Sequence, residues 1–224
     1  MLLQILNIVG IAVFAASGAL VGIRKDFDIW GIATVAVLTG VGGGILRDLL
    51  LGITPPASLE NWVPVTTALI AALVTVIFHP SFALLRRTIV VLDAIGMGLF
   101  AATGASIAID HHAHAFAATL IGMLAAIGGG VLRDVLANEI PLLLQPADLY
   151  AVPALVASAV VAVGRTYSEL PSQVWVIAGL IVGALFRVVA FFLGWRLPMA
   201  PRGLGIRHTR TTPLDNDPER DEPA

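Results

Sequence analysis

Two arginine–aspartate pairs lie inside long apolar segments of this 224-residue chain. The first pair closes the run Gly42-Gly-Gly-Ile-Leu-Arg-Asp48, and the second closes the run Gly128-Gly-Gly-Val-Leu-Arg-Asp134. A charge in the interior of a bilayer costs roughly 2.5–3.5 kcal/mol on insertion scales, so such side chains normally face a protein interior or water. Neighbouring helical residues point about 100° apart. We therefore expect each arginine to pair with a residue of another helix and not with the adjacent aspartate.

The positions of these motifs reveal a duplication. They lie 86 residues apart, and at the same offset Phe14-Ala-Ala-Ser-Gly-Ala19 recurs as Phe100-Ala-Ala-Thr-Gly-Ala105, while Asn7 corresponds to Asp93. Each copy carries three long apolar segments. Three membrane crossings deliver the chain to the opposite side, so the second copy must enter the bilayer upside down. This pattern is typical of inverted-repeat permeation proteins, whose functional site lies between the repeats near the middle of the membrane.

The composition indicates a membrane protein. Hydrophobic residues make up 58% of the chain and charged residues only 12%, which is about half the charged share of an ordinary soluble domain. The net charge of −2 offers no basic face for nucleic acid. The chain has no cysteine, which excludes disulfides and thiolate metal sites. No nucleophile–base arrangement or phosphate-binding loop is present, so we predict neither an enzyme activity nor a cofactor.

Seven transmembrane helices of about 20 residues each are expected, because backbone polar groups in lipid must be paired internally. The fold is then an all-α membrane protein of two inverted three-helix repeats, residues 1–83 and 84–168, with a seventh helix within 169–195 and a disordered cytoplasmic tail, 196–224. Basic residues in the first and third connections and in the tail place the N-terminus outside and the C-terminus in the cytoplasm, across the inner (plasma) membrane. The expected spans are 2–23, 29–51, 62–78, 88–109, 115–137, 149–164 and 172–194.

This topology brings particular polar residues to the same depth. Arg133 and Asp93 fall in the inner half of the membrane, and Arg47 and Asn7 fall in the outer half. We therefore expect an Asp93–Arg133 contact inside and an Asn7–Arg47 contact outside. Because asparagine is uncharged, the inner site should be held by an ion pair and the outer site by a weaker hydrogen bond, so that the two ends gate differently. The alternative is that these charges only pin helices together.

The glycine triplets fall near the middle of the second and fifth spans. Three consecutive helical glycines cost on the order of 1 kcal/mol each relative to alanine. We expect the helix to be kinked or locally unwound there, with exposed backbone carbonyls lining a polar path. The alternative is a flat seam for tight helix crossing. The residues expected at the helix breaks are Gly42, Gly43, Gly44, Gly128, Gly129 and Gly130.

Other polar residues are weaker candidates. Ser17 and Thr103 lie beside glycine in mid-span, where a hydroxyl bonds back to its own helix, bridges to a facing helix or lines a pore; packing is the favoured role. We expect Arg187, towards the cytoplasmic end of the seventh span, to extend to the lipid headgroups. A histidine cluster in the loop after the fourth span fits a solvated loop better than a metal site. Its members are His111, His112 and His114.

The doubled Gly-Gly-Gly-x-Leu-Arg-Asp signature, the three-helix repeats and the seventh helix resemble the prokaryotic TRIC proteins, the trimeric intracellular cation channels, over about residues 1–195. The resemblance implies a homotrimer in membrane lipid, in which each subunit has its own hydrophilic pore for monovalent cations, above all potassium. It also implies that the second and fifth helices are broken at their glycines and line this pore. Resemblance and position together place these polar residues along or beside the pathway: Asn7, Ser17, Arg47, Asp48, Asp93, Thr103, Arg133 and Asp134.

We expect a passive cation channel. The first alternative is a secondary transporter for a small zwitterion such as glycine, because inverted repeats suit alternating access and paired Arg and Asp could hold the two ends of an amino acid. The second alternative is a membrane scaffold that transports nothing. Substitution of the Arg-Asp residues distinguishes them: a channel changes conductance or selectivity, a carrier loses saturable uptake, and a scaffold loses only assembly.

Overall fold

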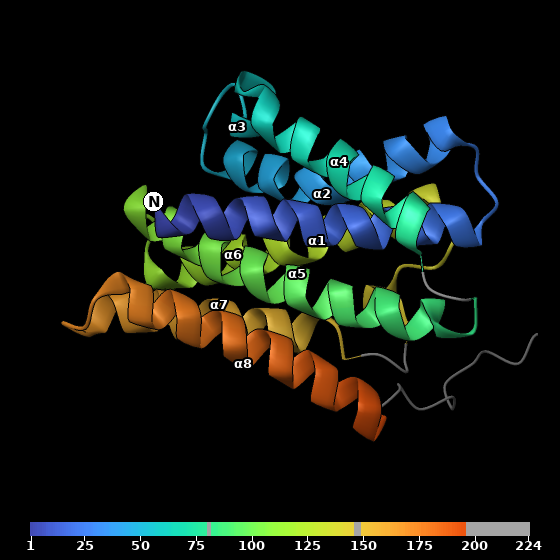
Figure 1. Cartoon of the computed structure of the whole chain (residues 1–224). Helices are drawn as coiled ribbons and strands as arrows, with labels where there is room; N and C mark the ends of the chain where they lie inside the picture. Colours follow the sequence, from blue (N-terminus) through green and yellow to red (C-terminus); the bar gives the residue numbers. More distant parts are fainter. Residues whose placement is uncertain (80–81, 146–148, 196–224) are drawn as a thin grey trace, which may run out of the picture.

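The computed structural model describes residues 1–79, 82–145 and 149–195, and within these ranges all regular structure is helical (Figure 1). The expected tail, residues 196–224, lies outside the described residues. The elements in chain order are α1 (Leu2–Arg24), α2 (Ile29–Leu50), α3 (Ala57–Glu60), α4 (Trp62–Phe78), α5 (Phe82–Asp110), α6 (Ala115–Leu136), the 3-10 turn η1 (Leu142–Leu144), α7 (Ala151–Tyr167) and α8 (Ser172–Leu193).

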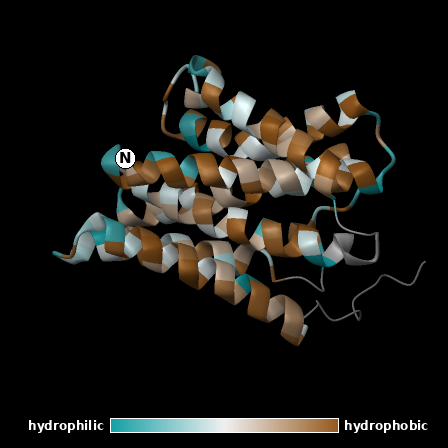
Figure 2. Ribbon diagram, viewed as in Figure 1, coloured by the Kyte–Doolittle hydropathy of each residue, from teal (hydrophilic) through white to brown (hydrophobic). Residues whose placement is uncertain are grey.

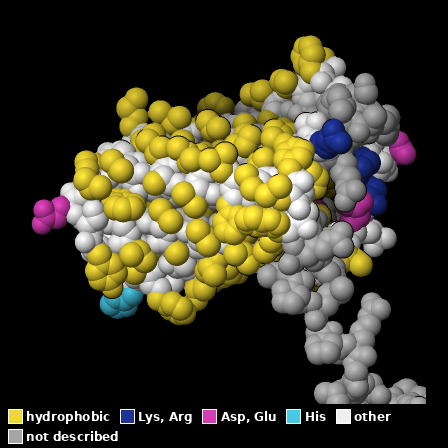
Figure 3. Space-filling view, turned by 90° about the horizontal axis from the view of Figure 1, so that it is seen from below, with side chains coloured by type: hydrophobic (Ala, Val, Ile, Leu, Met, Phe, Trp, Pro, Cys, Tyr) yellow, Lys and Arg dark blue, Asp and Glu magenta, His cyan; other side chains and the backbone are white. Residues whose placement is uncertain are grey.

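The outer surface of the bundle is apolar, as a membrane protein requires. Ile70, Leu73 and Phe192 are all more than half exposed, and Figure 2 shows hydrophobic residues along the helices, with hydrophilic ones mainly towards their ends. Figure 3 shows a broad hydrophobic face with Lys and Arg gathered at one end. Five helices, α1, α2, α5, α6 and α8, contain segments long and apolar enough to cross a membrane. The 17-residue helices α4 and α7 are apolar but shorter, so their full crossing stays a prediction.

Local signals explain where helices begin and end. Asp28 accepts a hydrogen bond from the Gly31 amide at 2.7 Å and so caps the start of α2. Asn61 caps α4 in the same way through the Val63 amide at 2.9 Å. Helix α8 ends at Gly194, whose φ of 65° lies in the left-handed region that glycine adopts without strain.

Corresponding helices of the two copies run in opposite directions. Helix α1 starts at the end of the bundle where the N-terminus lies, and α5 runs back towards that end (Figure 1). The rings of Phe14 and Phe100, which occupy the same position in the two copies, stack with centroids 5.3 Å apart. A Cβ on Gly43 would lie 3.6 Å from the amide nitrogen of its counterpart Gly129. Residues that meet their own counterparts lie where a two-fold axis relating the copies would pass, which is through the ring stack and between the glycine triplets.

Helix α5 is central and packs against α1, α6, α7 and α8. Small residues allow these close approaches. A Cβ on Gly96 would lie 2.6 Å from the Phe14 ring of α1, and one on Gly98 would lie 2.8 Å from the Leu180 carbonyl oxygen of α8. Asp93, one turn before Gly96, is therefore fully buried where α5 meets its neighbours.

We predict that Gly43→Ala destabilises the bundle, because its Cβ would overlap the carbonyl oxygen of Ala125 on α6. Overpacking of this kind costs typically about 1–3 kcal/mol, and backbone atoms cannot yield unless α2 and α6 separate. Gly128→Ala is the matched control, since its Cβ meets the end of the Leu46 side chain at 3.2 Å and the Gly43 Cα atom at an ordinary contact distance of 3.5 Å. Tryptophan fluorescence of the detergent-solubilised protein should show a lower Tm for Gly43→Ala than for Gly128→Ala. Equal Tm values would contradict a close seam at this position.

Candidate functional site

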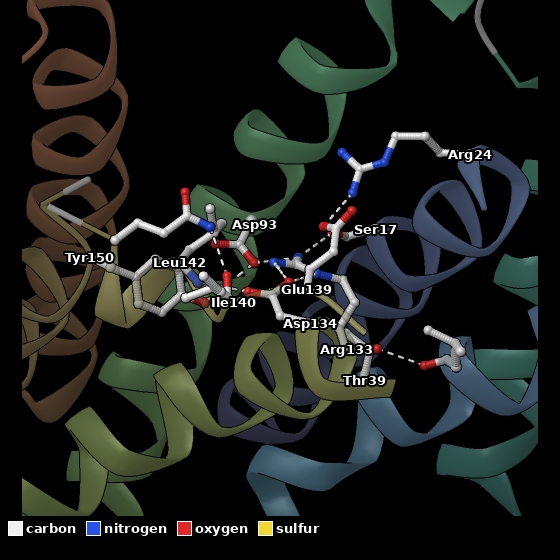
Figure 4. A network of polar contacts seen from close by, with 12 residues as sticks. Ser17, Arg24, Thr39, Asp93, Arg133, Asp134, Glu139, Ile140, Leu142 and Tyr150 are labelled. Carbon is white, nitrogen blue, oxygen red and sulfur yellow. Dashed lines mark hydrogen bonds and ion pairs between the residues drawn. The ribbon is translucent and has the colours of Figure 1, made fainter. Parts of the chain in front are cut away.

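Arg133 is the centre of a buried polar network (Figure 4). From α6, its Nη1 donates to Asp93 Oδ1 on α5 at 2.6 Å and to Ser17 Oγ on α1 at 2.7 Å. All three residues are fully buried. The predicted Asp93–Arg133 contact is confirmed, and Ser17 bridges to a facing helix. One guanidinium group thus joins three helices.

Each motif arginine also pairs with the aspartate that follows it, contrary to our expectation. Arg133 Nε donates to Asp134 Oδ1 at 2.9 Å, and Arg47 Nε donates to Asp48 Oδ1 at 2.8 Å. The angular argument was wrong because it considered only where side chains leave the helix. An arginine side chain is long enough to fold back across that angle and reach its neighbour. Each motif therefore neutralises much of its own charge.

The same aspartates fix the loops that follow their helices. Asp48 Oδ2 accepts a hydrogen bond from the Ala57 amide at 3.0 Å, and Asp134 Oδ2 accepts one from the Leu142 amide at 2.8 Å. Each carboxylate thus accepts a hydrogen bond from the arginine with one oxygen and from the following backbone with the other. The motif has a structural role in both copies, as the helix-pinning alternative predicts.

The first repeat does not reproduce the network around Arg133. Asn7 forms no hydrogen bond with Arg47, so this expected contact is wrong: Asn7 Oδ1 and Arg47 Nη1 are both buried without a hydrogen-bond partner. Both residues line one cavity of about 20 Å³. The carboxamide carries no charge to draw the guanidinium across this space, and Asp48 holds Arg47 instead. The hydroxyl of Thr103 donates back into its own helix, to the Leu99 carbonyl oxygen at 2.7 Å.

Helices α2 and α6 continue through their glycine triplets, so the expected local unwinding is wrong, while a kink there and a polar path beside it stay predictions. The triplets form a seam. A Cβ on Gly43 would overlap the carbonyl oxygen of Ala125, and one on Gly129 would overlap that of Thr39. Because glycine has no side chain, the two backbones touch while each helix keeps its own hydrogen bonds. Tight helix crossing, the alternative interpretation, accounts for this geometry.

The sequence did not point to Tyr150 as part of the network, and it pointed to another position for Arg187. The Tyr150 hydroxyl lies 3.3 Å from Asp93 Oδ1 and donates to it. The Arg187 guanidinium of α8 lies 4.7 Å above the Tyr150 ring and donates to the Leu149 carbonyl oxygen at 3.0 Å. Arg187 is fully buried, so its expected extension to the headgroups is wrong. Comparison of the repeats gave no signal, since Tyr150 corresponds to Pro64 and α8 has no counterpart.

Buried charges balance within the part of the chain that the structure describes. A buried charge whose partner is removed is strongly destabilising, so a carboxylate beside a buried guanidinium favours stability here. The balance also means that the bundle interior carries no net positive charge to repel a cation. The buried charged residues are Arg47, Arg133 and Arg187, with Asp48, Asp93 and Asp134.

A second ionic cluster covers the end of the bundle nearest Arg133. Glu139, just beyond α6, lies 2.6 Å from Arg24 Nη2 and 2.9 Å from Lys25 Nζ. Beside it lies a cavity of about 50 Å³ that is lined by Glu139, Arg133 and Asp134. Partial burial favours the neutral acid, but the hydrogen bond from Lys25 and the charge of Arg24 outweigh it and hold the pKa of Glu139 below its ordinary value. The histidine loop after α5 forms no such cluster, and the described residues contain no group of three His, Asp or Glu side chains suited to a metal ion.

Comparison with known proteins agrees with this architecture. The family model described as "Glycine transporter" matches the chain twice, over residues 4–80 and 90–166, with starts separated by the same 86 residues as the motifs. A solved TRIC trimeric intracellular cation channel orthologue from Rhodobacter sphaeroides is 34% identical, with a TM-score of 0.81 over 87% of this chain and 99% of that one. The chain belongs to the prokaryotic TRIC family.

Further relatives of this TRIC family member point the same way. A structure solved to explain conductance through TRIC cation channels is 35% identical, with a TM-score of 0.79 over 90% of this chain and 98% of that one. The inner membrane protein YadS of Escherichia coli K12 is 34% identical over 199 residues, which cover 88% of this chain and 96% of YadS. The TRIC protein described here is therefore a membrane protein whose structural relatives are cation channels and not enzymes.

We predict that Asp93→Asn destabilises the protein by about 3–5 kcal/mol, because it leaves Arg133 without the carboxylate of α5. Asp110→Asn is the matched control: Asp110 pairs with Arg165 at 2.8 Å but its side chain is 46% exposed, and exposed pairs contribute about 1 kcal/mol or less. Thermal unfolding in detergent measures both. A Tm for Asp93→Asn no lower than that for Asp110→Asn would contradict the central position of the Asp93–Arg133 pair.

The lowered pKa of Glu139 predicts a pH dependence of stability. The stabilisation from its cluster is present above the ordinary glutamate pKa of about 4.3 and is lost as the pH falls through the lower value of the folded state. The wild-type Tm should therefore fall more than that of Glu139→Gln between about pH 6 and about pH 3. Parallel pH profiles for the two proteins would show that the cluster adds no stability.

Proposed function

We propose that this TRIC protein is a homotrimeric, potassium-permeable channel with one pore in each subunit, between α1, α2, α5 and α6. The observation that carries the proposal is the neutralisation of both motif arginines by aspartates, at 2.7 Å in the first copy and 2.9 Å in the second. A cation passing between these helices meets guanidinium groups whose charge is already balanced. The solved relatives described as TRIC cation channels support the assignment.

Two polar cavities mark the ends of the proposed path. The cavity of about 20 Å³ lies beside Arg47 and Asp48, and that of about 50 Å³ lies beside Arg133 and Asp134. The ion-paired aspartate at each end leaves no net positive charge there to repel a cation. The stack of Phe14 on Phe100 lies on the axis that relates the two ends. This arrangement fits a closed conformation, with two small chambers on either side of the axis.

Arg133 is the proposed gate between the chambers. Its bonds to Asp93 and Ser17 join α6 to α5 and α1, and conduction requires some of these bonds to be exchanged for water or for the ion. By the positive-inside rule, Arg24 and Lys25 place this gate in the cytoplasmic half of the membrane and put the N-terminus outside. The gate would then respond to the cytoplasmic side.

The proposal is tested by recording from purified protein in a planar lipid bilayer under a potassium chloride gradient. Unitary currents that reverse near the potassium equilibrium potential are the expected result. The purified particle should have about three times the 23.4 kDa mass of one chain. Silent bilayers together with saturable glycine uptake by the same folded protein would overturn the channel and favour the carrier, which the family description also names.

We predict that Ser17→Ala raises the open probability of the channel without changing its unitary conductance. The substitution removes one hydrogen bond of Arg133 across helices, at 2.7 Å, and leaves every charge in place. Thr103→Ala is the matched control, because the hydroxyl of this counterpart bonds within its own helix. Equal open probabilities for the two variants would contradict the gate assigned to Arg133.

A further inference from the structure

The cavity at the N-terminal end of the bundle is the first repeat's version of the Arg133 site. In the second repeat, the Asp93 carboxylate accepts from the guanidinium and the Tyr150 hydroxyl donates to the same carboxylate. At the offset of 86 residues their counterparts are Asn7 and Pro64. Neither supplies a charged acceptor or a hydroxyl, and the two residues border a cavity of about 20 Å³ instead.

Three buried polar atoms around this cavity have no hydrogen-bond partner among the residues that the structure describes. They are Asn7 Oδ1, Arg47 Nη1 and Ser58 Oγ, and all three residues line the cavity. Arg47 is 4% exposed and Ser58 is 8% exposed, so bulk water does not solvate them. Buried polar groups left unpaired are strongly unfavourable. Three of them around one space therefore indicate a bound ligand.

The size and charge of the cavity define that ligand. A bound water needs roughly 10–15 Å³ of accessible space, so the cavity of about 20 Å³ holds one. The ligand must accept from Arg47 Nη1 and donate to Asn7 Oδ1, and water does both. A small anion could only accept, so it would leave Asn7 Oδ1 without a donor.

We propose that this cavity is a binding site for one neutral hydrogen-bonding ligand, a water molecule, in the place that the Asp93 carboxylate occupies in the second repeat. The water accepts from Arg47 and donates to Asn7, and the Ser58 hydroxyl is its third partner. The first repeat is thus hydrated where the second is ion-paired. One consequence rests on the proposed channel function: the path is wet on the Asn7 side at rest, and its barrier lies on the Asp93 side.

The direct test is the electron density of the wild-type protein in crystals grown in sodium bromide. A single peak within hydrogen-bonding distance of Asn7 Oδ1 and Arg47 Nη1, without anomalous signal at the bromine edge, is the expected result. An anomalous peak would identify an anion and overturn the proposal. Ordered side chains around an empty site would overturn it as well.

Gly44 provides a second test in solution. It lines the cavity, and its Cβ would lie 3.7 Å from the Phe100 ring and 4.0 Å from Arg47 Nη2, so alanine meets no clash. If the cavity were dry, Gly44→Ala would fill it, improve helix propensity and raise Tm. We expect Tm to fall by about 2–4 °C instead, because the methyl group displaces the water and leaves its partners unpaired. A raised Tm would overturn the proposal.

Asn7→Asp in the Gly44→Ala background supplies the matched rescue. The carboxylate provides the acceptor that Arg47 lacks, as Asp93 does for Arg133, so at least half of the lost Tm should return. Asn7→Leu in the same background is the control and should return less, since it provides no acceptor. Equal values for the two double variants would overturn the proposed role of the water. None of these measurements depends on conduction, so a failed channel assay leaves them intact.

Discussion

The bundle depends on one constraint: a guanidinium group far from water must be neutralised by groups that the helices themselves provide. Arg133 takes a carboxylate from α5, a hydroxyl from α1 and a second carboxylate from its own helix. In lipid, apolar surfaces gain little by meeting each other, so polar bonds and close packing decide which helices associate. Movements that separate α1, α5 and α6 are disfavoured because they would take from this charge the Asp93 carboxylate and the Ser17 hydroxyl. Tyr150 extends the same constraint to α8, where it lies beneath the Arg187 guanidinium.

The glycine seam between α2 and α6 positions the polar network. Contact between the backbones of α2 and α6 at Gly43 and Gly129 fixes the spacing of the two helices that carry the Arg-Asp motifs. With that spacing fixed, the two arginines lie on opposite sides of the local axis, each with its own chamber. Duplication therefore supplied two equivalent positions, and later substitutions made them chemically different. In the proposed channel, this difference would let one end be held shut while the other stays accessible.

The sequence predicted those features that follow from topology. Helix order and the Asp93–Arg133 contact came from counting crossings and comparing depths, because a buried charge has few possible partners. Features that depend on the reach of a side chain could not be predicted in this way. The Arg133 side chain folds back onto Asp134, and the uncharged carboxamide of Asn7 forms no hydrogen bond with Arg47. Continuity of the helices through the glycines reflects interhelical contact, which propensity does not include. Tyr150 corresponds to Pro64 in the first copy and Arg187 lies on α8, which has no counterpart, so symmetry could not point to them.

The stacked rings of Phe14 and Phe100 have an evolutionary meaning. A residue that touches its own symmetry mate forms the kind of isologous contact found at the centre of two-fold homodimers. A change at either phenylalanine therefore alters the contact made by the other. The two copies cannot vary independently at this position, although elsewhere, as at Asn7 and Asp93, they differ.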